Sequence, residues 1–216
     1  MINKLNKRLL FALTLNVVIV ILECIGFYLR INTSNKFFFK YYTELSNVIS
    51  LFSSLFFMIF AIKSIIINSI SIPKWVKRLK YICTSSLALT FFIVFLTILP
   101  ITNKDFSRVM LSDSFVFHHT LCPIVSIISF VFLEDYGSNT KKDLLIACLF
   151  TYIYAFTVII LNAFKFIRGP YSFLHVYEQP LYLTIAYILI ILVGIYLISK
   201  LLLICNNYIS NKCKSN

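Results

Sequence analysis

The stretch SFVFHHTLCPIVSIISFVFL, Ser114 to Leu133, contains no Lys, Arg, Asp or Glu. A helix needs about 20 mainly apolar residues to cross the hydrocarbon core of a bilayer. The stretch has that length and therefore predicts a membrane-spanning helix. Its beginning is unusual, because His118 and His119 stand side by side at the head of an apolar run.

Five further apolar runs predict spans of the same kind. They are Leu9–Leu29, Tyr42–Ile67, Tyr81–Ile101, Leu144–Phe166 and Leu181–Ile204. The composition agrees, since 60% of the 216 residues are hydrophobic and only 13% are charged, against roughly a quarter charged in soluble domains. A lipid-exposed backbone must satisfy its own hydrogen bonds. With only 4 Gly and 5 Pro to form linkers, we expect one all-α domain over residues 1–216, a bundle of six transmembrane helices.

The distribution of basic residues predicts the orientation. The N-terminus, the segments Lys63–Lys80 and Lys141–Lys142, and the tail from Lys200 carry 13 Lys and Arg, and the opposite loops carry 7. By the positive-inside rule both termini are expected in the cytoplasm. The apolar run after Arg8 has no small-residue cleavage site, so it is interpreted as a retained anchor in a multi-pass protein of a bacterial-type cell membrane.

Several classes of function are disfavoured. The net charge of +12 is spread in short clusters rather than along one face, which favours anionic membrane lipids over nucleic acid as the partner. The six cysteines show no metal-ligand spacing and lie mostly in or beside apolar runs, where a thiol acts as a small hydrophobe. We expect no metal, no cofactor and no disulfide framework, and the oligomeric state is left open.

The polar residues inside or next to the spans are predicted to gather near the non-cytoplasmic face. Ionisable groups in a membrane usually face a bundle interior or a wet cavity, so their convergence suggests a site. The inner halves of the spans are nearly all apolar, with Lys63 as the main exception, which argues against a path through the membrane. The candidate residues are Glu23, Thr43, Glu44, Asn47, His118, His119, Arg168, Tyr171, His175 and Glu178.

Each candidate also has a structural interpretation. Thr43 can bond back to a carbonyl of its own helix, and Asn47 or a protonated Glu23 can join neighbouring helices. Arg168, His175 and Glu178 can be ordinary interfacial residues. Adjacent helix positions point about 100° apart, so one histidine is expected to face the bundle and the other a neighbour or the headgroups.

A threonine beside a histidine has a known chemical use. The imidazole, with an ordinary pKa of about 6.5, takes the hydroxyl proton as the oxygen attacks an acyl carbonyl. No GxSxG, HExxH or phosphate-binding loop offers another catalytic motif. Thr43 as nucleophile and His118 as base are the predicted catalytic pair.

Three stretches support this pair by resemblance. YYTELSNVISLF from Tyr41, HHTLCPIVSIISFVFLED from His118 and TYIYAFTVIILNAFKFIRGPYSFLHV from Thr151 resemble a bacterial family of six-span membrane proteins. That family more distantly resembles the androgen-induced threonine hydrolases, which cleave fatty acid esters of hydroxy fatty acids. The resemblance implies six spans, Thr43 and His118 as the catalytic residues, and a long-chain acyl ester as substrate.

The leading hypothesis is therefore an intramembrane threonine hydrolase that cleaves lipid esters near the outer leaflet. Asn47, His119 or Tyr171 would stabilise the oxyanion. The alternative is a non-enzymatic membrane protein, a small transporter or an interaction partner, with a polar cavity at the same position. A hydrolase needs Thr43 and His118 within hydrogen-bond reach, whereas a transporter needs a polar path to the cytoplasmic side.

Overall fold

The computed structural model describes residues 4–33, 38–69, 71–95, 106, 110–135, 137 and 141–215. The chain is 86% helical without strands in this part, which confirms the all-α fold. Five long helices are α1 (Lys4–Thr33), α2 (Tyr42–Ile66), α3 (Lys74–Ile93), α8 (Lys141–Ala163) and α9 (Leu181–Ser215). A broken rod comprises α6 (Asp113–Phe115), η3 (Val116–Leu121), α7 (Cys122–Ile128) and η4 (Ser129–Leu133). The loops contain η1 (Phe38–Lys40) and η5 (Ser172–Leu174).

Five of the described helical segments are long and apolar enough to cross a membrane. They are Lys7–Thr33, Tyr42–Ile66, Asp113–Leu133, Lys141–Ala163 and Leu181–Cys213. The predicted span Tyr81–Ile101 is not among them, and residues 96–101 of it lie outside the described residues. Helix α3 begins before the predicted start of this span. Pro73, with φ −58°, precedes its first turn, and the basic segment ahead of Tyr81 is helical from Lys74 onward.

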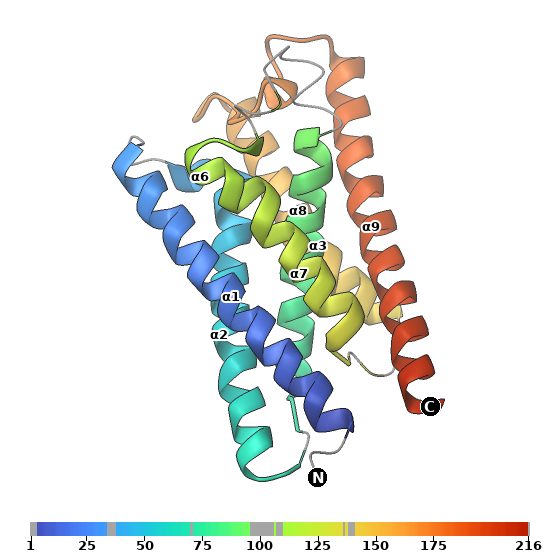
Figure 1. The fold of residues 1–216 in the computed structure, drawn as a ribbon. Coiled ribbons are helices and arrows are strands. Elements are labelled where there is room, and N and C mark those ends of the chain that lie inside the picture. Colours follow the sequence, from blue (N-terminus) through green and yellow to red (C-terminus); the bar gives the residue numbers. More distant parts are fainter. Residues whose placement is uncertain are drawn as a thin grey trace.

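Helix α3 occupies the centre of the bundle. It contacts α2, α7, α8 and α9, and Figure 1 shows it behind the broken rod and between α2 and α9. Every residue from Cys83 to Thr90 is buried. The run Thr84–Ala88 is mostly small, and small residues let neighbouring helix backbones approach closely. Helix α3 is also the least apolar of the long helices, because its first turns carry four basic residues and its centre is rich in small polar ones.

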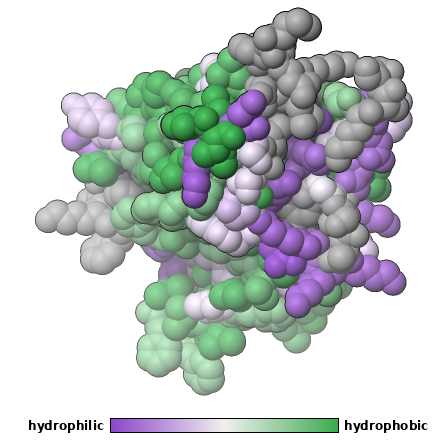
Figure 2. All heavy atoms as spheres, turned by 90° about the horizontal axis from the view of Figure 1, so that it is seen from below, coloured by the Kyte–Doolittle hydropathy of each residue, from purple (hydrophilic) through white to green (hydrophobic). Residues whose placement is uncertain are grey.

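The outside of the bundle fits a lipid environment. Large apolar side chains are exposed along the helices, among them Phe11, Phe52, Phe132, Phe156 and Leu189. Helix α1 begins and α9 ends at the same end of the bundle (Figure 1). Figure 2, which looks at that end, shows hydrophilic side chains gathered over part of the face, with hydrophobic ones around them. The structure is thus that of a multi-pass membrane protein.

The broken rod owes its shape to Pro123. Proline has no N–H and its ring clashes with the carbonyl four residues earlier. The chain adapts with a π-helical turn, in which the N–H of Cys122 bonds to the carbonyl of Phe117, five residues before it. A second π-helical turn closes the rod, where the N–H of Glu134 bonds to Ser129. Such turns are frequent at functional sites, and here they carry the two histidines and the end at Glu134.

The half of the bundle near the termini is not apolar inside, which corrects the prediction made from the spans. Lys80 is 0% exposed and Glu134 6% exposed. Both lie just outside the predicted spans. The early start of α3 and the π-helical end of the broken rod turn these two side chains inward, where Asn16, Ser54, Ser126, Ser129 and Asn206 are also buried.

Candidate functional site

His118 lies between two buried carboxylates. Its Nδ1 is 2.9 Å from Oε2 of Glu44, and its Nε2 is 3.7 Å from Oε2 of Glu23. All three side chains are at most 2% exposed. The carboxylates come from different helices, Glu23 from α1 and Glu44 from the first turn of α2. The imidazole therefore joins two acidic groups that the sequence places far apart.

Arg30 completes this group, which we call the histidine cluster (Glu23, Arg30, Glu44 and His118). Its Nε is 2.9 Å from Oε1 of Glu44. Its guanidinium lies 5.3 Å from the ring centre of Phe115 and 5.9 Å from that of Tyr41, within the range of cation–π attraction. Arg30 offsets one of the two carboxylate charges, and His118 is the group that lies beside both carboxylates.

Buried polar atoms without a well-aligned hydrogen bond gather in and beside the histidine cluster. Ten such side-chain atoms occur in the described part of the chain, and eight of them belong to Glu23, Arg30, Glu44, Asn47, Ser50 and His118. Three of the eight, on Arg30, Glu44 and His118, lie in the ion pairs of 2.9 Å given above. Buried polar groups in proteins are nearly always hydrogen-bonded. By contrast, the buried Asp143 accepts a well-formed bond from Arg78 at 2.8 Å. The groups around His118 are therefore less completely hydrogen-bonded than the Arg78–Asp143 pair.

Gly26 allows His118 to sit against α1. A Cβ at this position would come within 2.6 Å of His118 Cδ2 and 3.0 Å of Phe117 Cβ. The His118 ring also lies 4.6 Å from the Phe27 ring, centre to centre. The ring is thus wedged against one turn of α1, and only a glycine leaves it room.

Asn47 has a structural task that follows from Pro123. The carbonyl of His118 would receive its helical bond from Cys122 or, in a π turn, from residue 123. Cys122 donates to Phe117 instead, and proline has no N–H. The Nδ2 of Asn47 donates to this carbonyl at 3.3 Å and to the carbonyl of Thr43 at 2.7 Å. Asn47 thereby fixes the backbone of the broken rod against α2.

Thr43 lies next to Glu44 but faces another way. Its hydroxyl is 3.3 Å from the hydroxyl of Tyr171, and its N–H donates to Tyr171 at 3.4 Å. Burial raises the pKa of Tyr171 to about 12, so its hydroxyl keeps its proton at neutral pH. The ring nitrogens of His118 form no hydrogen bond with Thr43. The predicted catalytic pair is therefore not assembled as a hydrogen-bonded dyad in this conformation.

Thr43 instead lines a small apolar cavity of about 40 Å³. Its walls come from α2, α3, α8, α9 and the loop after α8, and include Leu89, Ile93, Tyr154 and Phe173. Through the contacts of Tyr171 and Phe173, this loop folds over the Thr43 end of α2.

The charged residues of that loop pair with one another. Arg168 donates to Glu178 at 2.7 Å, and His175 Nδ1 is 3.1 Å from the same oxygen. The bond from Arg168 holds the pKa of Glu178 below its ordinary value of 4.5. Arg168 and Glu178 are 71% and 51% exposed, so they stand apart from the histidine cluster.

His119 is also separate from the cluster. It is buried, and its ring stacks on Phe115 with 4.8 Å between centres, so it faces a neighbouring side chain, one of the two positions expected for the second histidine. The structure thus brings Glu23 and His118 together, with Asn47 beside them. It gives Glu44, a polar candidate without a predicted role, a place beside His118, and it adds Arg30, which the sequence offered only as one of the basic residues of the loops.

Comparison of the chain with family models, with curated proteins and with solved structures found no match in any of the three. The described residues also hold no group of three or more His, Cys, Asp or Glu side chains placed to bind a metal ion. The chemistry of the site must therefore be argued from its own geometry.

Proposed function

We propose that this chain is a six-span membrane protein whose histidine cluster takes up and hands on protons as part of proton movement across the membrane. The observation that carries the proposal is the position of His118, with one ring nitrogen toward Glu44 and the other toward Glu23. An imidazole accepts a proton at one nitrogen and releases one from the other, and its ordinary pKa lies near neutrality. Chains of Glu and His inside membranes commonly mark proton relays.

The arrangement of the bundle supports the wider part of the proposal. A six-span topology with both termini in the cytoplasm agrees with the 13 to 7 division of basic residues. It also agrees with the common end at which α1 begins and α9 ends. In that orientation Glu44, in the first turn of α2, lies toward the outside, and Glu23 lies deeper in the bundle.

Removal of the Glu23 carboxylate tests the proposal. The protein is reconstituted in liposomes loaded with a pH-sensitive dye, and a potassium gradient with valinomycin drives proton entry. Glu23→Gln keeps the shape of the side chain but cannot bind and release a proton. We expect its proton flux to fall about 10²-fold, the lower range for loss of a proton-transferring group.

Glu178→Gln is the matched control, because it removes an exposed carboxylate outside the histidine cluster. It should conduct like the wild type. A wild-type protein that conducts no better than empty liposomes refutes the proposal, and so does an unchanged flux in Glu23→Gln.

Lipid-ester hydrolysis is the second candidate function, with a long-chain acyl ester as substrate. The observation that favours it is the Thr43 hydroxyl on the wall of an apolar cavity beneath the loop at Tyr171. Catalysis would require His118 to turn from Glu44 toward Thr43.

A fluorophosphonate probe distinguishes this second candidate from the proton relay. If Thr43 is the nucleophile, Thr43→Ala abolishes labelling of the purified protein and turnover of long-chain esters. Thr157→Ala, an exposed threonine on α8, should leave both unchanged. Absence of wild-type labelling and turnover across a broad ester panel argues against hydrolysis.

A further inference from the structure

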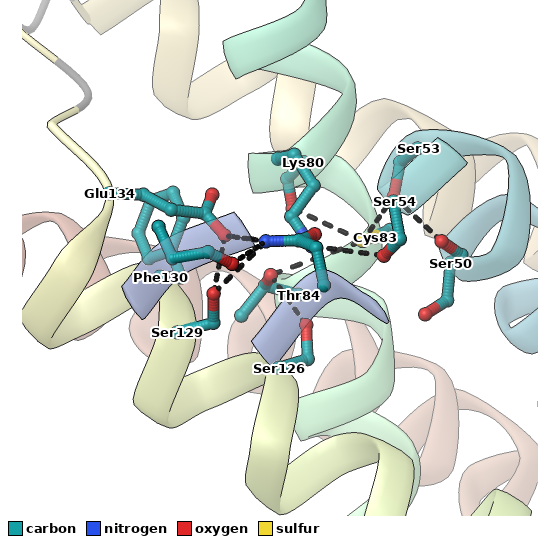
Figure 3. A network of polar contacts seen from close by, with 12 residues as sticks. Ser50, Ser53, Ser54, Lys80, Cys83, Thr84, Ser126, Ser129, Phe130 and Glu134 are labelled. Atoms are coloured by element: carbon teal, nitrogen blue, oxygen red, sulfur yellow. Dashed lines mark hydrogen bonds and ion pairs between the residues drawn. The ribbon is translucent and has the colours of Figure 1, made fainter. Parts of the chain in front are cut away.

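A second group of buried charges lies nearer the end where the termini meet. Lys80 is 0% exposed, its Nζ is 3.7 Å from Oε1 of Glu134, and it donates to Ser54 at 3.3 Å. The same carboxylate oxygen accepts from Ser129 at 2.7 Å and from Asn16 at 3.1 Å. We call Asn16, Ser54, Lys80, Ser129 and Glu134 the lysine cluster, and Figure 3 shows its centre.

The lysine cluster is held firmly in place. Asn206 of α9 donates to the carbonyls of Phe130 and Glu134 at 2.6 Å each, which satisfies the end of the π-helical turn. Lys80 and Glu134 form one buried ion pair, so their charges offset each other. Burying a charge inside a membrane protein costs free energy, and such charges usually have a functional role.

A row of polar side chains on one face of α2 extends from the histidine cluster to the lysine cluster. Asn47, Ser50 and Ser54 follow one another at intervals of three and four residues, so they share one face of the helix. Ser50 is a polar neighbour of the Glu23 carboxyl, and Ser54 contacts Lys80. The charges of Glu44 and Lys80 both act on the Glu23 carboxyl. Asn16 and Glu23, one from each cluster, are about 10 Å apart along α1.

Other small polar side chains border this row. Ser53 donates to the thiol of Cys83 at 3.0 Å, and the hydroxyls of Thr84 and Ser126 are 2.9 Å apart. Figure 3 shows these side chains between Ser50 and Glu134. The interior between the clusters is therefore lined by hydroxyl and thiol groups.

We infer that the lysine cluster is the second proton-exchange station, with Lys80 and Glu134 receiving protons from Glu23 along the Ser50–Ser54 row. This inference rests on the proposed function. It extends that function by naming the groups that carry protons from Glu23 to the end of the bundle near the termini. It requires no group outside the chain other than water and the proton itself.

The transfer conserves protons at each step. The Lys80 ammonium gives one proton to the Glu134 carboxylate, so an N–H bond breaks and an O–H bond forms. The neutral amine takes the next proton from the Ser54 side, where each hydroxyl accepts one proton and releases another. Glu134 then loses its proton at the end of the bundle near the termini. One proton has moved and every group has returned to its starting form.

The double variant Lys80→Met/Glu134→Gln tests this inference in the liposome assay. It removes both charges together, so no unpaired charge remains buried. We expect proton flux to fall at least tenfold. Arg78→Met/Asp143→Asn is the matched control, because it removes another ion pair that also begins on α3, between the half-buried Arg78 and the buried Asp143, and it should conduct like the wild type. Ser54→Ala, which interrupts the row without removing a charge, should also lower the flux at least tenfold.

Labelling by dicyclohexylcarbodiimide gives a readout that does not depend on flux. This apolar reagent modifies protonated carboxyl groups inside membrane proteins, and mass spectrometry identifies the residue. We expect Glu23 to be labelled equally in the wild type and in Lys80→Met/Glu134→Gln, which shows that the histidine cluster is intact. Wild-type flux in either that double variant or Ser54→Ala overturns the inference alone. A wild-type protein that shows no proton flux overturns the proposed function instead.

Discussion

His118→Ala should abolish proton flux, whereas His119→Ala should retain most of it. His118 is the group that joins Glu44 to Glu23, while His119 stacks on Phe115 outside the histidine cluster. Loss of a proton-transferring side chain commonly costs about 10²-fold or more in rate. The two variants remove the same atoms from neighbouring positions of one π-helical turn, so each controls for the other.

The measurement is dye-reported proton entry into liposomes, normalised to the amount of folded protein recovered by gel filtration. If His119→Ala shows no proton flux and His118→Ala conducts normally, His119 rather than His118 is the proton carrier. If both conduct like the wild type, neither histidine carries protons and the proposed function fails.

Gly26→Ala should destabilise the protein, although alanine is normally the better helix residue. In an exposed helix interior the change from glycine to alanine gains about 1 kcal/mol. At Gly26 the new Cβ would collide with the ring of His118 and press on Phe117, and the ring cannot retreat because Phe27 and Glu44 flank it. Overpacking of this kind typically costs about 1–3 kcal/mol.

Gly194→Ala on α9 is the matched control. A Cβ there would meet only Leu89 Cδ1, at an ordinary 3.7 Å, so the substitution should be neutral or stabilising. Thermal unfolding in detergent measures both variants. Gly26→Ala should also lose proton flux, because His118 is pushed from its place between the carboxylates. Equal melting temperatures for the two variants would show that the ring moves aside freely.

Much of the fold could be predicted from local properties of the chain. Five of the predicted spans correspond to helices with the length and hydropathy needed to cross a membrane. The third was harder to place, because α3 is the central helix and its early turns carry Lys74, Lys77, Arg78 and Lys80. A hydropathy pattern assigns such residues to a loop. Only the contacts of α3 with four neighbours reveal that Lys80 is inside the bundle.

The candidate site could be predicted only in part. Glu23 and His118 were recognised as polar groups in apolar runs, and they do meet. Glu44 had no predicted role, because the chemistry was assigned to Thr43, the residue before it. Adjacent residues of a helix point about 100° apart, so the rotation of α2 decides which of them faces His118. Tertiary packing turned Glu44 toward the imidazole and Thr43 toward Tyr171.

The sequence by itself determined that the chain forms apolar helices in a membrane. Length and hydropathy are properties of each segment alone, and in lipid each segment must satisfy its own backbone hydrogen bonds. Only the tertiary structure decided which polar side chains meet, because that depends on how each helix is rotated and where the π-helical turns near Pro123 and Glu134 redirect side chains. The histidine and lysine clusters are products of that packing, assembled from helices that no local pattern in the sequence relates to one another.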